Sequence, residues 1–155
     1  SVQINIDWQK RIEAWQKQAK TVIIFSEDAQ AKILIAITDK IKQSSKLAID
    51  QLREMGIDVY MLTGDNQQTA KAIAEEVGLK NFKAEVMPAE KAAFVEQLQK
   101  KGKIVAMVGD GINDSHALAN ADVSIAMGKG SDIAMDVAKI TLITSDLNSI
   151  PKAIN

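Results

Sequence analysis

Helical segments and short apolar runs alternate along most of the chain, and this alternation constrains the fold more than any other feature. Apolar runs of strand length lie at residues 57–62, 82–86, 104–108, 123–126 and 140–143. Segments with helical periodicity lie before, between and after them, at residues 44–55, 67–77, 88–100, 113–119, 131–137 and 147–154. Such alternation is typical of a parallel sheet covered by helices on both faces. We therefore predict an α/β fold that binds ligands at the carboxyl ends of its strands.

The N-terminal part of the chain follows a different pattern. Residues 7–20 have the spacing of an amphipathic helix, for which Asp7 is the expected N-cap. Two β-rich runs, at residues 21–26 and 31–38, are joined by a short polar link and predict a β-hairpin. A polar stretch at residues 38–43 follows the hairpin and is a candidate domain boundary.

Composition excludes several classes of protein. The chain has 155 residues, of which 46% are apolar and 25% charged, and this suits one globular domain with a real core. A net charge of −1 and only 4% aromatic residues argue against a nucleic-acid partner. With no Cys and a single His, the chain can form neither a disulfide framework nor a thiolate or His-rich metal site. No apolar run approaches the roughly 18 residues of a membrane span, and no signal peptide opens the sequence, so we expect a soluble chain.

The loop after the run 57–62 is the first candidate site, and it reads Thr63, Gly64, Asp65 and Asn66. Thr63 offers a hydroxyl at a strand end, and Gly64 lets a ligand approach the backbone closely. The helix that follows directs its N-terminal amides toward the same place, which suits a phosphate group. The alternative is an ordinary turn that ends in a helix cap.

The loop after the run 104–108 is the second candidate site. It carries two carboxylates, Asp110 and Asp114, on a glycine-flanked turn at a strand end, so both can face one point. Oxygen ligands of this kind suit Mg²⁺, which binds one or two carboxylates together with phosphate and water. Asn113 can hydrogen-bond to a phosphoryl oxygen. The alternative is a tight turn with a capping Asp, although a turn alone does not require so many polar groups.

Lys91 and His116 are further candidates. Lys91 lies early in the helix that Pro88 opens, where a lysine opposes the helix dipole and a bound anion would compensate. The alternative for Lys91 is a solvated surface charge, as for most lysines. No residue near His116 in the sequence pairs with it, so we expect a helix-surface or internally satisfied histidine rather than a general base.

Three segments, in this order, resemble the phosphorylation domain of P-type cation-transporting ATPases, which belongs to the haloacid dehalogenase-like superfamily. They read Met-Leu-Thr-Gly-Asp-Asn at residues 61–66, Met-Pro-Ala-Glu-Lys at 87–91 and Val-Gly-Asp-Gly-Ile-Asn-Asp at 108–114. Residues 121–134 continue the match, and residues 145–150 are similar to the heavy-metal branch, especially copper exporters. The resemblance implies a Rossmann-like, haloacid dehalogenase-type fold.

The resemblance assigns phosphate-binding and catalytic roles. Thr63 corresponds to the hydroxyl that binds the transferred phosphoryl group, with the Gly64 amide beside it. Lys91 corresponds to the lysine that neutralises charge on the phosphoryl group and the nucleophile, and Asn113 to a residue that supports the phosphate. This set is chemically sensible because phosphoryl transfer depends mostly on positioning and charge neutralisation.

The resemblance also implies a metal and a nucleotide. Asp110 corresponds to the Mg²⁺ ligand, and Asp114 to an acid that supports the Mg²⁺ site. Asp65 resembles the acid near the nucleotide and the interdomain hinge. Mg²⁺ is therefore the expected cofactor, and ATP is the expected substrate of the parent protein.

The sequence departs from the family pattern at the nucleophile. The family uses an aspartate in an Asp-Lys-Thr-Gly-Thr segment, which is absent here; residues 39–42 read Asp-Lys-Ile-Lys and resemble the hinge. We therefore expect a fragment, with residues 1–38 as the end of the nucleotide-binding domain and residues 39–155 as the C-terminal part of the phosphorylation domain. The sheet would lack the strand that carries the nucleophile. The isolated chain is thus expected to be inactive and to dimerise more readily than an intact domain.

The parent expected from the resemblance is a heavy-metal pump. The chain would then be a cytoplasmic portion of an integral protein of the inner or plasma membrane. Its partners would be the remaining nucleotide-binding, actuator and transmembrane domains, and Cu⁺ would be the transported ion. Two alternatives stay open: a soluble regulatory binding module without a nucleophile, favoured if the reading frame began near Ser1, and a soluble phosphatase of the same superfamily, against which the missing nucleophile argues.

Overall fold

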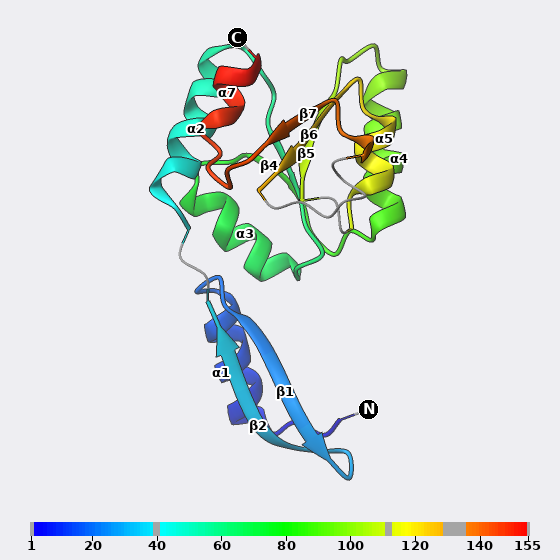
Figure 1. The fold of residues 1–155 in the computed structure, drawn as a ribbon. Helices are drawn as coiled ribbons and strands as arrows, with labels where there is room; N and C mark the ends of the chain where they lie inside the picture. Colours follow the sequence, from blue (N-terminus) through cyan, green and yellow to red (C-terminus); the bar gives the residue numbers. More distant parts are fainter. Residues whose placement is uncertain (1, 39–40, 111–112, 129–135, 155) are drawn as a thin grey trace. The chain divides into compact units, whose positions relative to one another are not determined.

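The computed structural model describes residues 2–38, 41–110, 113–128 and 136–154 (Figure 1). The chain divides into two compact units, Ser1–Glu85 and Val86–Asn155. The first unit contains a helix, a hairpin, a second helix and a βαβ segment, and the second unit contains a three-stranded sheet with its helices. The boundary that the sequence suggests near residue 38 lies inside the first unit and stays a prediction.

The first helix, α1 (Ile6–Gln16), is shifted and shortened relative to the expected 7–20. Its N-cap is Asn5, whose Oδ1 accepts a hydrogen bond from the Trp8 amide at 2.8 Å. The expected cap, Asp7, lies in the first turn instead, so that prediction was wrong. The helix cannot continue through residue 19, because Ala19 has a left-handed backbone with φ of 55°.

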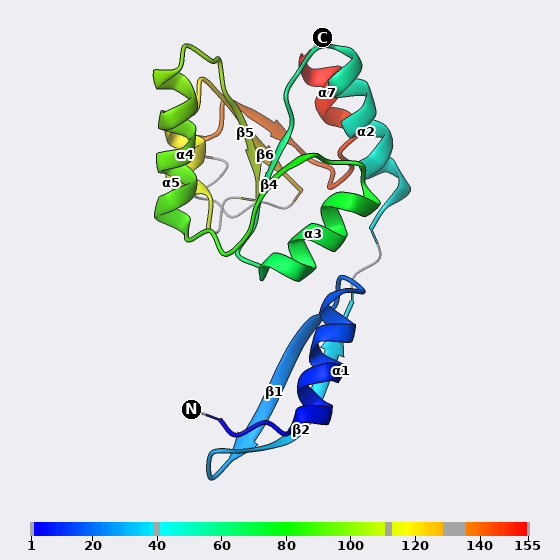
Figure 2. The same cartoon turned by 180° about the vertical axis from the view of Figure 1, so that it is seen from behind.

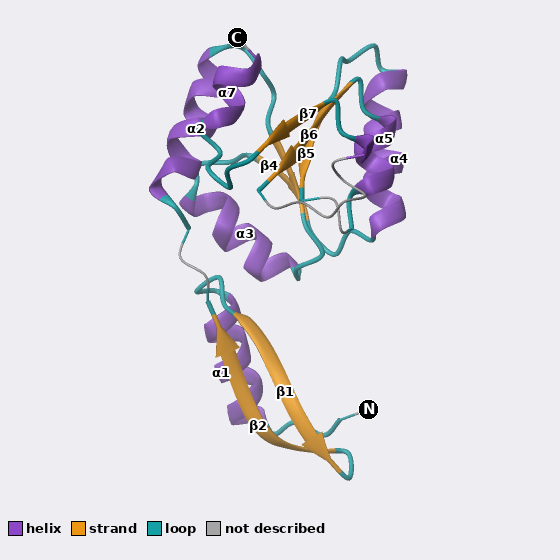
Figure 3. Ribbon diagram, in the orientation of Figure 1, coloured by secondary structure: helices purple, strands orange, loops and turns teal. Residues whose placement is uncertain are grey.

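A β-hairpin follows, formed by β1 (Thr21–Glu27) and β2 (Gln30–Ile37), and the prediction of antiparallel strands is confirmed. Residues that face each other across the register share one side of the sheet. Five large apolar side chains on one such side are 47–57% exposed, and together they form what we call the apolar hairpin face: Ile23, Phe25, Ile33, Ile35 and Ile37. Val22, Leu34 and Ala36 alternate with them and are partly buried. Helix α1 lies along the hairpin in both views (Figures 2 and 3).

Helix α2 and a βαβ segment complete the first unit. Helix α2 (Gln43–Glu54) precedes β3 (Tyr60–Leu62), α3 (Gln67–Glu76) and β4 (Asn81–Lys83). The two strands pair in parallel, and α3 forms the crossover between them. Both strands are shorter than the apolar runs that predicted them, because the hydrogen-bonded ladder covers only three residues of each strand.

The second unit is a parallel sheet with helices. Its elements are α4 (Pro88–Lys100), β5 (Ala106–Gly109), α5 (Ser115–Asn120), β6 (Val123–Met127), β7 (Ile140–Leu142) and α7 (Ser149–Ile154). The strands pair in parallel in the order β5–β6–β7. Helices α4 and α5 lie side by side in both views (Figures 1 and 2). The predicted α/β class with parallel strands is confirmed, whereas the helix expected at residues 131–137 falls mostly outside the described residues.

Small side chains let α4 and α5 approach each other closely. Ala92 of α4 and Ala117 of α5 belong to one buried cluster, against which Met107 of β5 packs. Leu118 and Ala126 form a neighbouring cluster, both with no exposed surface, and Met107 contacts this cluster as well. This packing fixes the ends of β5 and α5, and therefore the two ends of the loop between them.

Membrane-spanning segments were not expected from the sequence. In the part of the chain that the structure describes, no helix has both the length and the apolar character needed to cross a bilayer.

Candidate functional site

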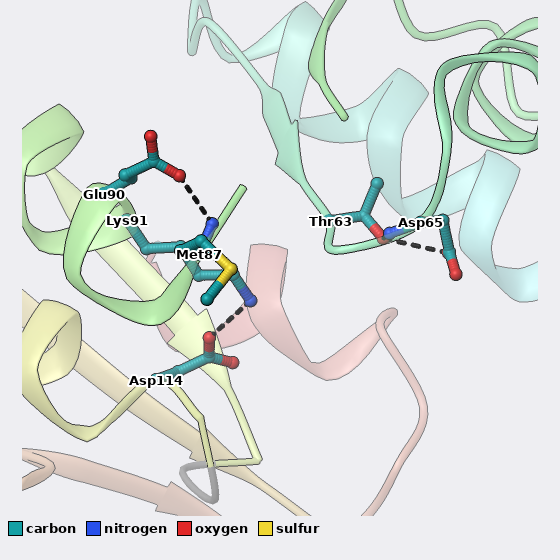
Figure 4. A network of polar contacts seen from close by, with 6 residues as sticks. All are labelled: Thr63, Asp65, Met87, Glu90, Lys91 and Asp114. Atoms are coloured by element: carbon teal, nitrogen blue, oxygen red, sulfur yellow. Dashed lines mark hydrogen bonds and ion pairs between the residues drawn. The ribbon is translucent and has the colours of Figure 1, made fainter. Parts of the chain in front are cut away.

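The loop after β3 holds Thr63 and Asp65 in a hydrogen-bonded turn (Figure 4). The Thr63 hydroxyl donates to Asp65 Oδ2 at 2.9 Å, and the Asp65 amide donates back to Thr63 Oγ1 at 3.1 Å. The Thr63 amide also donates to the Lys83 carbonyl at 3.0 Å, which fixes this loop to β4. Thr63 and Asp65 are partly buried and Gly64 is exposed. The Thr63 hydroxyl is thus held at the strand end, and an acceptor that binds it must compete with Asp65.

Asn66 starts α3 immediately after this turn. Its Oδ1 accepts hydrogen bonds from the amides of Gln68 and Thr69 at 3.1 and 3.0 Å, and its Nδ2 donates to Thr69 Oγ1 at 3.0 Å. The capping interpretation of this loop is therefore correct for Asn66. Because Asn66 already binds these two amides, they are not available to a phosphate group, contrary to what the sequence led us to expect.

Lys91 and Asp114 form a short, largely buried ion pair (Figure 4). Lys91 Nζ lies 2.7 Å from Asp114 Oδ1, and each side chain is only 13% exposed. Lys91 comes from the first turn of α4, and Asp114 lies directly before α5. Lys91 is therefore not the solvated charge that a lone lysine usually is. Its charge is neutralised by a carboxylate that lies 23 residues further along the chain.

The first turn of α4 is fixed by the residues around Lys91. Pro88 occupies the first helical position, and the Met87 amide donates to Glu90 Oε2 at 2.7 Å. This bond satisfies one of the amides that a helix start leaves without an intrahelical partner. The backbone from which Lys91 extends is thereby held in one conformation.

The other candidate residues of the second unit are open to solvent. Asp110 follows β5 directly and is exposed, and so is Asn113. His116 is exposed on α5, which agrees with the expected helix-surface histidine. The second unit thus brings Lys91 and Asp114 into contact, with Asp110 and Asn113 on the loop that leads to this pair.

The chemistry of these donors fits a hard divalent cation. Asp110 presents a carboxylate at a strand end, while Asp114 has Oδ1 bonded to Lys91 and keeps Oδ2 as a second acceptor. No group of three His, Cys, Asp or Glu side chains gathers as a metal site within the described ranges. Mg²⁺ does not need one, since it commonly binds one or two carboxylates and completes its shell with water and phosphate.

The sequence did not predict the Lys91–Asp114 contact, nor the part that Gly109 plays beside it. A Cβ atom placed on Gly109 would lie only 2.6 Å from Asp114 Oδ2. The two signals that could have suggested this contact are an isolated lysine in a helix's first turn and a glycine at the end of the apolar strand run. Neither signal identifies its partner without the fold.

Comparison with known proteins identifies the family. A model of the haloacid dehalogenase-like hydrolases matches residues 2–122. The chain belongs to this family.

The curated relatives of this haloacid dehalogenase-like chain include copper ATPases. It is 54% identical over 147 residues to a probable copper-transporting ATPase, PacS, of Synechocystis sp. strain PCC 6803, a match that covers 95% of this chain and 20% of the relative. It is 53% identical over 144 residues to a copper-exporting P-type ATPase of Bacillus subtilis strain 168, covering 93% of this chain and 18% of that protein. The chain thus spans about a fifth of the length of these relatives.

Solved structures of P-type ATPases share the fold. A zinc-transporting PIB-type ATPase in an E2.Pi state superimposes with a TM-score of 0.78 and 34% sequence identity, over 97% of this chain and 25% of that one. A catalytic domain of the CPx-ATPase CopB-B superimposes with a TM-score of 0.68 and 31% identity, over 80% of this chain and 48% of that one. The resemblance to heavy-metal P-type ATPases that the motifs predict is therefore confirmed.

Proposed function

We propose that this chain is part of a copper-exporting P-type ATPase, in which it supplies phosphoryl- and Mg²⁺-binding residues for the formation and hydrolysis of an aspartyl phosphate. The observation that carries the proposal is the 54% identity over 147 residues to a copper-transporting ATPase, because an alignment of that length must include all three motifs. We assign residues 1–38 to the end of the nucleotide-binding domain and residues 39–155 to the phosphorylation domain.

Each candidate residue has a role in this proposal. The Thr63 hydroxyl and the Gly64 amide bind the transferred phosphoryl group at the end of β3. Asp65 orients the Thr63 hydroxyl through the 2.9 Å hydrogen bond. By the family resemblance, Asp65 is also the acid near the nucleotide and the hinge. Lys91 supplies positive charge where negative charge accumulates during transfer, and Asn113 donates to a phosphoryl oxygen.

Asp110 would hold Mg²⁺, and Asp114 would support the site. Bound Mg²⁺ supplies charge neutralisation for the phosphoryl oxygens. Asp114 serves a second purpose, since its Oδ1 already holds the Lys91 ammonium group. The nucleophile would come from a segment outside this sequence, because no Asp-Lys-Thr-Gly-Thr stretch is present.

The proposed partners follow from the pump. The chain would work with the remaining nucleotide-binding, actuator and transmembrane domains, on the cytoplasmic side of an integral membrane protein. ATP would be the substrate and Cu⁺ the transported cation. Copper is proposed because the relatives that are 53–54% identical are named as copper ATPases.

ATP turnover tests this proposal. In the complete product of the gene that encodes this chain, the replacements Lys91→Ala and Asp110→Asn are expected to lower turnover by roughly 100-fold or more, as for other charge-stabilising groups. His116→Ala changes an exposed side chain and is the control, with turnover near that of the wild type. The isolated 155-residue chain is expected to show neither turnover nor covalent phosphorylation. Robust ATPase activity of the isolated chain, or full activity of Lys91→Ala, would contradict the proposal.

A further inference from the structure

The last residue of β5, Gly109, leaves space that the carboxylate of Asp114 occupies. A Cβ atom built on Gly109 would lie 2.6 Å from Asp114 Oδ2, 3.0 Å from its Cβ and 3.1 Å from its Cγ. Real Cβ atoms essentially never approach another heavy atom closer than 3.0 Å. Any side chain at position 109 would therefore force Asp114 to move.

The backbone of Gly109 does not itself require glycine. Four other glycines (Gly56, Gly78, Gly102 and Gly128) have positive φ angles between 73° and 78°, where a side chain is strained. Gly109 does not have a positive φ, and it pairs with Ala126 in the regular parallel ladder of β5 and β6. An alanine could adopt this conformation, so the need at position 109 is for space.

Asp114 cannot give up this position without losing Lys91. Its Oδ1 binds Lys91 Nζ at 2.7 Å, and its own carbonyl accepts the first-turn hydrogen bond from the Leu118 amide at 2.8 Å. The carbonyl bond anchors the backbone of Asp114. Oδ2 and Cγ can move away from a neighbouring Cβ by rotation of the side chain, whereas the Asp114 Cβ, also only 3.0 Å away, can move only with the backbone. Either movement displaces the carboxylate from the position in which it binds Lys91.

We propose that Gly109 is a positioning residue: its missing side chain makes room for the Asp114 carboxylate, which in turn holds the Lys91 ammonium group. The contribution of Gly109 to phosphoryl transfer rests on the function proposed above for Lys91. The steric coupling of the three residues does not, since it follows from contacts within the second unit.

The Lys91 ammonium group provides a direct readout of this coupling. In the ¹⁵N-labelled 155-residue chain, a lysine held by a short ion pair and 13% exposed should give a slowly exchanging ammonium resonance. Both Gly109→Ala and Asp114→Ala are expected to shift this resonance or remove it. Lys100 of the same helix is 80% exposed and paired only at 3.9 Å, so its ammonium protons should exchange fast with water in every variant, and it is the unprotected comparison.

Gly102→Ala is the matched control. Gly102 has φ of 76° with no atom within 4 Å of an added Cβ, so alanine there strains the backbone without crowding a neighbour. This variant should become less stable while keeping the Lys91 resonance. An unchanged Lys91 resonance in Gly109→Ala, in a chain where Asp114→Ala abolishes it, would overturn the proposal.

A double variant covers the case in which Gly109→Ala does not fold. Asp114→Ala removes Oδ2 and Cγ, which the new Cβ would meet at 2.6 and 3.1 Å, and leaves the Cβ of residue 114 at 3.0 Å. Adding Gly109→Ala in this background should therefore lower the urea midpoint less than in the wild type. Equal losses in both backgrounds would overturn the coupling. A wild-type chain with a normal Lys91 resonance, but a complete gene product without ATP turnover, would instead refute the proposed function and leave the positioning role standing.

Discussion

Ion pairs of two kinds occur among the residues that the structure describes. Arg53–Asp50, Lys71–Glu75 and Lys100–Glu96 are exposed pairs of neighbouring helical turns, with separations of 3.7–3.9 Å. Such pairs stabilise a helix by only about 0.3–0.5 kcal/mol. Lys91–Asp114 differs in separation, in burial and in its long span along the chain. It therefore contributes to the tertiary fold and to the candidate site at once.

Replacing Lys91 should lower the stability of the protein more than replacing a lysine of an exposed pair. Lys91→Met keeps all but the last heavy atom of the side chain and leaves the partly buried Asp114 carboxylate without its cation. We expect a loss of about 1–3 kcal/mol in the free energy of unfolding, measured by urea denaturation. Lys100→Met is the control and should cost less than about 0.5 kcal/mol. Similar costs for both variants would show that the Lys91 pair is no stronger than a surface pair.

The sequence predicts the interactions of a residue only where its partners are close to it along the chain. Asn66 could be recognised as part of a turn and cap because its partners are two and three residues away. The partner of Lys91 could not be derived in the same way, since it lies 23 residues further along the chain and meets Lys91 only after α4 and α5 pack. The resemblance nevertheless drew attention to both Lys91 and Asp114.

At the scale of elements, the best-predicted boundaries were those with strong local signals. Helix α4 covers the predicted residues 88–100 because Pro88 fixes its start and Gly102, with positive φ, follows its end. The limits of α1 were predicted less well, because two polar residues, Asn5 and Asp7, could both cap it and no glycine or proline marks its end. Strand limits were overestimated wherever an apolar run extended beyond the hydrogen-bonded ladder.

The start of α3 can be tested through its cap. Asn66→Ala removes the oxygen that accepts two amide hydrogen bonds, and it should lower the free energy of unfolding by about 1 kcal/mol. Asn66→Ser keeps a side-chain oxygen at the cap and should lose only part of this. Urea denaturation of the two variants would measure the difference. An alanine variant as stable as the wild type would mean that water replaces the cap without cost.

The link between β5 and β6 should depend on pH. Asp122 Oδ2 accepts a hydrogen bond from the Val105 amide at 2.8 Å, and this bond holds the pKa of Asp122 below its ordinary value of 3.8. A carboxyl whose pKa is lower in the folded state stabilises the protein above its unfolded pKa, and this contribution is lost as the pH falls through the folded value. Asp122→Asn should therefore have a lower urea midpoint than the wild type at pH 7.

Urea midpoints of the two proteins measured in acid test whether the charge of Asp122 is stabilising. Asn keeps an acceptor oxygen but no charge, so the midpoints of Asp122→Asn and the wild type should converge as the pH is lowered below about 4. A difference that stays constant from pH 7 to pH 3 would show that the charge of Asp122 does not contribute. It would assign the effect of the substitution to packing or hydrogen-bond geometry instead.

At the scale of the whole molecule, the hairpin stands out because few of its large apolar side chains are buried. An isolated two-stranded hairpin is at best marginally stable in water, and this one has α1 beside it together with the apolar hairpin face. The dimerisation expected from the missing strand of the sheet stays a prediction, and the apolar hairpin face is a second candidate surface for self-association, because an isologous contact would bury the same residues in both copies.

Light scattering after size-exclusion chromatography would test self-association of the 155-residue chain. We expect a concentration-dependent dimer that is weakened in the Ile33→Thr/Ile35→Thr variant, since both side chains are about half exposed. Threonine suits a strand, so the hairpin itself should persist. A chain that is monomeric at all concentrations, or a dimer that the variant does not weaken, would contradict self-association through the apolar hairpin face.

The whole-molecule assignment is the central claim, and phosphorylation of the complete gene product tests it most directly. The purified protein would be incubated with γ-labelled ATP and Mg²⁺, with and without Cu⁺, and then quenched in acid. We predict an acid-stable, hydroxylamine-labile phosphoprotein whose labelling depends on Cu⁺, as expected for an aspartyl phosphate formed during copper transport. A folded, complete protein that acquires no label with any metal would contradict the assignment and favour a non-catalytic binding module.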